Sequence, residues 1–209
     1  MRITFPRLPD HSRGYSIVER DDGVTYRLWG GPVTAQLPHD LEHLTVEDAL
    51  DIYDGIWASI AGGVVFDSMD HLRGRRPPHA TEHSRLLMKA HGPDLSRAEL
   101  VGGLIARLAE RERLDIASLR RFSTMWFSVL PPAAREGTHV YGPDGEVDAP
   151  RVLAAVDKLR RANADWQAVP VGGKLVREWP PYRRLVPLAA RARQAARRPV
   201  NSRMPHRVR

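Results

Sequence analysis

Two histidines and two acids recur at helical spacing near residue 40. The stretch "LPHDLEHLTVED" (37–48) carries His39 and His43 four positions apart. Glu47 follows after another four positions, and Asp40 directly follows the first histidine. On an α-helix, residues four positions apart lie on one face, about 40° apart around the axis. Two imidazoles at this spacing can reach one ion at about 2 Å from each nitrogen. The spacing therefore predicts a divalent-metal site with His39 and His43 as ligands.

The acids near these histidines supply the other expected roles. Glu47 or Asp54 is the expected carboxylate ligand, and Glu47 must reach back because it lies about 80° from His39 around the axis. Asp40 is expected to be either a further ligand or the general base that activates a bound water, as the acid does in H-E-x-x-H. The same window also satisfies H-x-x-E-H through Glu42. Zinc is the first expectation for two imidazoles and a carboxylate, and iron(II) is the alternative.

An alternative interpretation needs no metal. On the same helix, Val46 and Leu50 lie beside the histidines, whereas Leu41 and Leu44 lie on the opposite side. A helix that is apolar on two sides is expected to be largely buried. Buried imidazoles and carboxylates must be paired or must bind a metal. The histidines might thus equally satisfy a polar patch beneath a sheet.

Several classes of site have no support in the sequence. The chain has no cysteine, which excludes disulfides and thiolate ligands and leaves His, Asp and Glu as the strong metal ligands. There is no G-x-S-x-G, no phosphate-binding G-x-x-x-x-G-K-[ST] and no G-x-G-x-x-G after a predicted strand. The chemistry that remains is that of the histidines and acids.

The first third of the chain is rich in β-prone segments. Residues 2–5, 15–20 and 24–30 are predicted strands, with a hairpin turn at 20–23. Residues 32–37 are either a fourth strand or an extended entry to the next helix. A helix is then expected from Pro38 to about residue 51, because proline suits the first helical position.

The rest of the chain is mostly helical by pattern. Apolar or amphipathic segments that predict helices are 54–69, 81–91, 96–113, 115–130 and 149–166. Ser96 and Glu99 form a capping-box pattern that predicts the start of one of them. Residues 166–179 are expected to form a hairpin that turns at Gly172 and Gly173, with its second strand pairing with the N-terminal strands. We therefore expect a single α+β domain over 1–180, mostly helical, with a small antiparallel sheet from the N-terminal strands and a C-terminal hairpin.

The basic character of the chain is concentrated at its end. Residues 181–209 hold nine arginines and no acid, so subtracting nine from the net charge of +7 leaves −2 for residues 1–180. We expect a basic, partly disordered tail. In the alternative function, the protein is a non-catalytic interaction protein whose tail contacts nucleic acid or an acidic partner. Tyr182 is the single aromatic residue in the tail, which disfavours a stacking surface for single strands.

The sequence also gives an expectation for location. No apolar run approaches the roughly 20 residues that span a bilayer. The N-terminus, "MRITFPRLPDHSRGYS", lacks the apolar core of a secretory signal. A cytoplasmic location is expected.

Two resemblances add to this interpretation. "HDLEH" (39–43), followed by an acid-containing helix, resembles the H-D-x-x-H…E motif of the helical ubiquinone-biosynthesis family named for coenzyme Q assembly, over about 25 residues. The resemblance implies a divalent metal, usually taken as zinc, with His39, Asp40 and His43 as ligands. Asp54 is the acid nearest to the position of the distal glutamate in that family.

Over its whole length, the chain is similar to a group of uncharacterised bacterial proteins. These proteins carry HDL-x-H before a DG-[aromatic or aliphatic]-W segment, here "DGIW" (54–57). This second resemblance implies no activity. Together the patterns predict a metal-binding protein that uses the His39, Asp40 and His43 helix, and a metal-dependent hydrolase or lyase if it is an enzyme, with an unknown small-molecule substrate.

Overall fold

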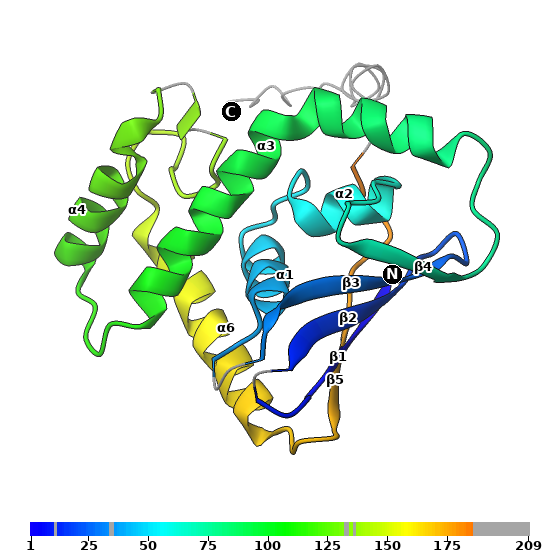
Figure 1. Ribbon diagram of the computed structural model, residues 1–209. Coiled ribbons are helices and arrows are strands. Elements are labelled where there is room, and N and C mark those ends of the chain that lie inside the picture. The colour runs from blue at the N-terminus through cyan, green and yellow to red at the C-terminus, as the bar shows by residue number, and fades with distance from the viewer. Residues whose placement is uncertain (11, 34–35, 132–133, 136, 186–209) are drawn as a thin grey trace, which may run out of the picture.

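The protein folds as an antiparallel sheet with helices packed on one of its faces (Figure 1). The structure is a computed structural model, and it describes residues 1–10, 12–33, 36–131, 134–135 and 137–185. The α+β class expected from the sequence is confirmed.

Five strands form the sheet, in the order β4-β3-β2-β1-β5, and every pairing is antiparallel. The strands are β1 (Arg2–Pro6), β2 (Arg13–Glu19), β3 (Thr25–Pro32), β4 (Met69–Arg73) and β5 (Lys174–Glu178). The expected hairpin turn at 20–23 joins β2 to β3, and β5 pairs with β1 as the sequence predicted. The first and last strands of the chain are therefore neighbours, which closes the domain.

Two details of the sheet differ from the sequence prediction. β4 was not expected, because Met69 is its only buried residue and its sequence lacks the apolar alternation of a typical strand. The predicted C-terminal hairpin is wrong in its first half, since residues 166–168 continue a helix. That helix ends at Val169, whose extended backbone (ψ 121°) is the conformation that the following Pro170 favours.

The helices follow the predicted segments with one large difference. They are α1 (His39–Ala49), α2 (Ile56–Gly62), α3 (Ala80–Ala109), α4 (Ile116–Trp126), the 3-10 helix η1 (Phe127–Val129) and α6 (Ala149–Ala168). The segments 81–91 and 96–113, predicted as two helices, form the single helix α3 with Pro93 in its interior. Proline removes one helical hydrogen bond, and α3 bends along its length (Figure 1).

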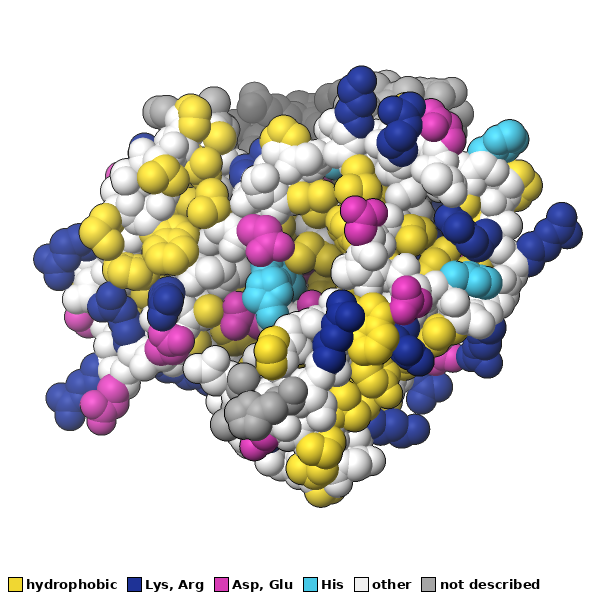
Figure 2. All heavy atoms as spheres, in the orientation of Figure 1, with side chains coloured by type: hydrophobic (Ala, Val, Ile, Leu, Met, Phe, Trp, Pro, Cys, Tyr) yellow, Lys and Arg dark blue, Asp and Glu magenta, His cyan; other side chains and the backbone are white. Residues whose placement is uncertain are grey.

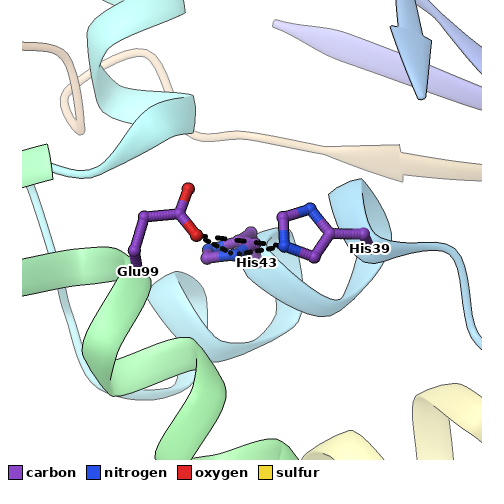
Figure 3. A group of neighbouring side chains, drawn as sticks. All are labelled: His39, His43 and Glu99. Carbon is purple, nitrogen blue, oxygen red and sulfur yellow. Dashed lines mark hydrogen bonds and ion pairs between the residues drawn. The ribbon is translucent and has the colours of Figure 1, made fainter. Parts of the chain in front are cut away.

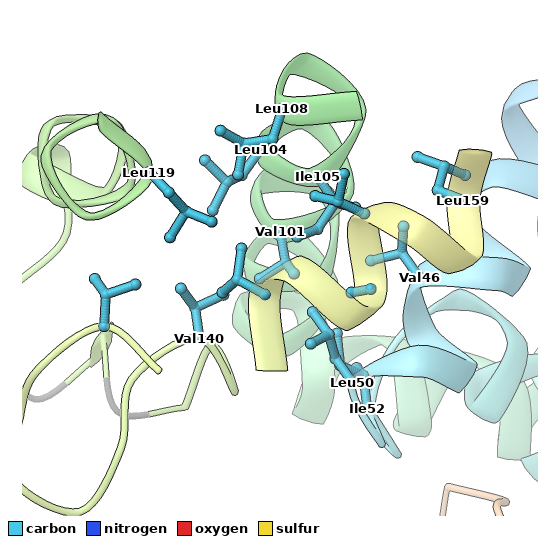
Figure 4. Close-up of a cluster of buried hydrophobic side chains, with 14 of the residues drawn as sticks. Val46, Leu50, Ile52, Val101, Leu104, Ile105, Leu108, Leu119, Val140 and Leu159 are labelled. Atoms are coloured by element: carbon cyan, nitrogen blue, oxygen red, sulfur yellow. The ribbon is translucent and has the colours of Figure 1, made fainter. Parts of the chain in front are cut away.

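Apolar packing holds α1, α3 and α6 together. Figure 4 shows side chains of the three helices meeting in one buried cluster, with Val46 and Leu50 of α1 facing Val101 and Ile105 of α3. The other side of α1 packs towards the sheet, where Leu41 belongs to a second cluster with strand residues. The two apolar sides expected for this helix are thus both buried, and α1 is fixed between the sheet and α3.

The chain contacts the domain beyond residue 180. Arg183 forms ion pairs with Asp48 and with Asp51, the latter at 2.6 Å, and the Leu185 N–H donates to the carbonyl of Ala58 at 2.8 Å. Residues 186–209, which hold most of the predicted basic tail, lie outside the described part of the chain. In the part that is described, no helix combines the length and apolar character that a bilayer span requires.

Candidate metal centre

Two helices bring the candidate ligands together. His39 is the first residue of α1, and His43 follows one turn later. Glu99 lies on α3, which packs against α1 in the apolar cluster described above. Figure 3 shows the two imidazoles and the Glu99 carboxylate pointing towards one another from these two helices. The position of all three groups depends on packing between segments more than 50 residues apart in the chain.

The three groups converge on one point. The Nε2 atoms of His39 and His43 are 3.2 Å apart. Glu99 Oε2 lies 3.1 Å from His43 Nε2 and 3.9 Å from His39 Nε2. Within the described residues, this is the group of three or more His, Asp or Glu side chains that is close enough to hold an ion.

These separations suit a shared ion. Ligand atoms about 2.05 Å from a zinc ion, at the tetrahedral angle, lie roughly 3.3 Å from each other. Two of the three separations match this value, and a small movement of the half-exposed Glu99 side chain would correct the third. Hydrogen atoms satisfy the arrangement less well. His43 Nε2 carries at most one proton but faces both a carboxylate and a second ring nitrogen.

The charges at the centre reinforce one another. Burial lowers the pKa of His43, but the hydrogen bond to Glu99 and the nearby carboxylates outweigh it, so the pKa is raised above its ordinary value. The hydrogen bond from His43 lowers the pKa of Glu99 against the opposing effect of burial. Without metal, the pair is therefore a charged imidazolium and carboxylate. A divalent cation would replace the shared proton as the positive charge between them.

A glycine in α3 makes room for His43. The His43 side chain is only 2% exposed and lies against α3 at Gly102. A Cβ at position 102 would lie 2.7 Å from His43 Cε1, closer than side chains pack. Glycine inside a helix costs about 0.5–1 kcal/mol relative to alanine, and here that cost allows the ring to fit. His43 Nδ1 has no hydrogen-bond partner in the described structure.

The centre is open to solvent on one side. The side chains of His39 and Glu99 are 64% and 49% exposed. They line a hollow of about 510 Å³ that also includes Glu42, Arg107 and Glu110. Figure 2 shows a histidine flanked by acidic side chains near the middle of this face. An ion held by the three groups would keep an open coordination position, as catalytic zinc sites do.

Asp40 lies beside His39 but on the other side of its ring. Its Oδ1 is 4.0 Å from His39 Nδ1, the nitrogen that faces away from the point of convergence. Burial raises the pKa of Asp40 to about 6, against the opposing effect of the two histidines. A carboxylate behind a ligating imidazole is the usual partner that orients the ring and raises its basicity.

The structure gives Glu47 different partners from those the sequence suggested. Its carboxylate is fully buried and accepts hydrogen bonds from the backbone N–H groups of Ile56 at 2.8 Å and Trp57 at 3.0 Å. These groups belong to the first turn of α2, where N–H groups lack helical partners. Gly55 permits the contact, because a Cβ there would lie 2.4 Å from Glu47 Cδ. Glu47 thus joins α1 to α2.

Burial has a strong effect on Glu47. It raises the pKa of this carboxyl to about 7, although His43 and the two backbone N–H groups favour the ionised form. Asp54, the other acid proposed as a ligand, lies 3.8 Å from Arg97 in an ion pair. Neither Glu47 nor Asp54 belongs to the group that converges with the histidines.

Glu99 is the functional candidate that the sequence reasoning missed. It was assigned to a capping box with Ser96, but that prediction is wrong because both residues lie in the interior of α3. Ser96 Oγ instead donates to the carbonyl of Gly92 at 3.2 Å. One signal was available: Gly102 follows Glu99 by three positions, so both share a face of the helix, and an interior glycine often marks close packing.

Comparisons of the chain with protein-family models, with curated proteins and with solved structures gave no match. The two resemblances drawn from the sequence therefore stay predictions.

Proposed function

We propose that the protein binds one divalent metal ion through His39, His43 and Glu99 and uses it in a hydrolytic reaction. The observation that carries the proposal is the convergence of two ring nitrogens and a carboxylate oxygen, with separations of 3.1, 3.2 and 3.9 Å. Zinc is the first candidate because two imidazoles and one carboxylate, with an open fourth position, are a ligand set of zinc enzymes. Iron(II) is the alternative, since the same set forms its facial triad.

Each residue has a distinct role in the proposed centre. A bound ion would supply Lewis acidity and lower the pKa of a coordinated water. His43 is the anchor because it is buried and held between α1 and α3. His39 and Glu99 complete the site from its solvent side, and Asp40 orients His39 through its Nδ1. The sequence-based expectation that Asp40 is the general base, and the one that the protein is cytoplasmic, stay predictions.

The proposal favours a catalytic rather than a structural ion. Structural zinc sites in proteins are closed by four protein ligands. Here three groups converge, and two of them are about half-exposed or more, so solvent and substrate have access to the fourth position. The acidic side chains at the rim, Glu42 and Glu110, also favour a cation in the hollow.

A metal titration tests the proposal. Metal-free protein is titrated with Zn²⁺, and separately with Fe²⁺ under anaerobic conditions, by calorimetry or by competition with a chromogenic chelator. We expect one equivalent to bind the wild-type protein, and His39→Ala and His43→Ala to weaken that binding by more than the roughly 10–100-fold typical of an outer-shell change. His83→Ala is the matched control, because this exposed histidine lies far along α3 and bonds to Gly62.

Activity is measured on the same samples. Hydrolysis of 4-nitrophenyl acetate should require bound metal and should be restored when zinc or iron(II) is returned to the metal-free protein. Binding of less than one equivalent, or equal binding by the wild type and His43→Ala, would contradict the metal site. Tight binding with no metal-dependent hydrolysis of any ester or amide would contradict the reaction alone.

A further inference from the structure

A second, mostly apolar cavity lies next to the metal centre. It has a volume of about 250 Å³ and lies between the ends of β1, β2 and β3, the start of α1 and the end of α6. Apolar side chains and glycines form most of its wall, including Phe5, Val33 and Trp166. His39 and Asp40 form part of the same wall. His39 also lines the hollow of the metal centre, so its imidazole lies between the two spaces.

One polar group of the cavity wall has no partner. The chain has five tryptophans. The indole N–H groups of four of them donate hydrogen bonds, to Asp70 for Trp29, Asp40 for Trp57, Leu100 for Trp126 and Arg183 for Trp179. Trp166 Nε1 is buried, and the described residues offer it no acceptor. Buried tryptophans usually find an acceptor for this N–H.

The neighbourhood of Trp166 explains its burial but leaves its N–H unpaired. Its side chain is 1% exposed, and the Arg7 guanidinium lies over the indole ring, with Cζ 4.8 Å from the ring centroid. An acceptor that completes the hydrogen bond would therefore come from the contents of the cavity rather than from bulk solvent. A buried donor without an acceptor costs about 1–3 kcal/mol.

The wall limits the chemical class of the ligand. An apolar lining favours an apolar body, and the volume is below the range typical of drug-sized ligands. An unpaired donor requires an acceptor such as a carbonyl oxygen. The carboxyl of Asp40 disfavours an anion in this space. A small, uncharged molecule with an aromatic or aliphatic ring and one carbonyl group meets all of these requirements.

We propose that this cavity binds such a ring-and-carbonyl compound, with its carbonyl oxygen accepting from Trp166 Nε1. The assignment of the compound as the substrate of the metal centre rests on the proposed function, because His39 is the wall shared by the two sites. In that case the substrate class is a small ester or amide with an apolar acyl or aryl group. Binding itself requires no metal.

Indole resonances of the full-length, metal-free protein test the proposal. The protein is labelled with ¹⁵N at tryptophan, and the Trp166 signal is assigned with Trp166→Phe. Benzamide, which carries a neutral ring and a carbonyl, is then titrated. We expect the Trp166 N–H signal to shift progressively and to saturate, while the signals of Trp29, Trp126 and Trp179 stay in place because their acceptors are already present.

Two further arms sharpen the result. Val33→Phe, which fills the cavity, should weaken benzamide binding by about tenfold or more, whereas Val171→Phe, at an exposed valine, should not. Benzoate should bind more weakly than benzamide. A Trp166 signal that does not move up to the solubility limit would overturn the proposal, and tighter binding of benzoate would overturn the neutral class.

The outcome is separable from that of the metal titration. Benzamide binding to a protein that fails to bind zinc would leave the cavity site standing and remove the hydrolytic function. Zinc binding without benzamide binding would do the reverse. If both bind, zinc should change the affinity for benzamide, because one imidazole is shared between the two sites.

Discussion

Two buried histidines in this protein, His43 and His91, form hydrogen bonds to a carboxylate, but only one of them belongs to a candidate metal site. His43 Nε2 is 3.1 Å from Glu99, and His91 Nδ1 is 2.8 Å from Asp94. In each ring the second nitrogen is buried without a partner in the described structure. Burial and a carboxylate are therefore not what distinguishes the two histidines.

The third group makes the difference. At Asp94 it is the guanidinium of Arg97, which forms a very close ion pair with the other carboxylate oxygen. That carboxylate already has a permanent positive partner, and its pKa is lowered by His91 and Arg97 against the effect of burial. At His43 the third group is the imidazole of His39, which brings another lone pair instead of a positive charge. A metal site needs lone pairs that converge without a resident cation.

The largest expected effect comes from neutralising each carboxylate in turn. Glu99→Gln should weaken zinc binding by more than about 100-fold, because it removes a ligand rather than an outer partner. Asp94→Asn should leave zinc affinity unchanged and lower the free energy of unfolding by about 1–3 kcal/mol, because it removes the ionised acceptor of a buried histidine. Calorimetric zinc titration and urea unfolding measure the two quantities. Equal zinc affinities for Glu99→Gln and Asp94→Asn would show that the comparison has no functional meaning.

The next effect is a dependence of stability on pH, centred on Glu47. The folded protein keeps a proton on this carboxyl up to a pKa of about 7, whereas the unfolded chain releases it near 4.5. Stability is therefore fully present below about pH 4.5 and is lost as the pH rises through 7. For metal-free protein, Glu47 alone should lower the free energy of unfolding by about 2 kcal/mol between pH 5 and 8.

Two variations separate this contribution from the metal centre. Glu47→Gln should remove most of the decline and add a constant cost, because its amide cannot accept from both N–H groups of α2. Saturating zinc should oppose the decline, because the metal binds deprotonated imidazoles and so favours the folded state more at high pH. Urea unfolding at pH 5, 6, 7 and 8 measures both. An unchanged slope in Glu47→Gln would assign the pH dependence to other groups.

The next effect compares two glycines of α3, one beside each histidine. Gly102→Ala should destabilise the protein by about 1 kcal/mol and weaken zinc binding, because its Cβ would press on the His43 ring. Gly92→Ala is the matched control, since a Cβ there meets nothing within 4 Å. It should stabilise the protein by about 0.5–1 kcal/mol, the usual gain for this change inside a helix. Thermal unfolding would measure both, and a stabilising Gly102→Ala would mean that His43 is not confined by α3.

The glycine pair also shows how far sequence reasoning reached. The pairing of His39 with His43 was predicted because both lie on one helix, where spacing alone sets the geometry. Glu99 was not, because its approach to them depends on how α1 packs against α3, and no local pattern encodes that contact. Glu47 was expected to face the histidines, but the unpaired N–H groups at the start of α2 are its partners in the fold.

The fold shows the same division between local and long-range information. The 20–23 turn and the pairing of β5 with β1 followed from turn residues and β-prone segments. The continuity of α3 did not, because Pro93 predicts a break. Buried residues on both sides of it, among them Leu87, His91 and Ala98, hold the helix together by tertiary contacts. Local propensity was overridden where packing was strongest.

The smallest expected effect tests that continuity directly, at Ser96. If a helix began there, Ser96→Ala would remove an N-cap and cost about 1 kcal/mol. In the structure the hydroxyl instead donates to the carbonyl of Gly92 within an unbroken helix. Such a bond competes with the helical hydrogen bonds, so Ser96→Ala should change the free energy of unfolding by less than about 0.5 kcal/mol. Asp115→Ala is the matched control, because Asp115 does cap α4 through the Ser118 N–H at 2.9 Å. Asp115→Ala should lose about 1 kcal/mol in the same urea series. A loss of that size at Ser96 as well would divide α3 in two, and Glu99 would then lie in a first turn where its own helix competes with the histidines for its carboxylate.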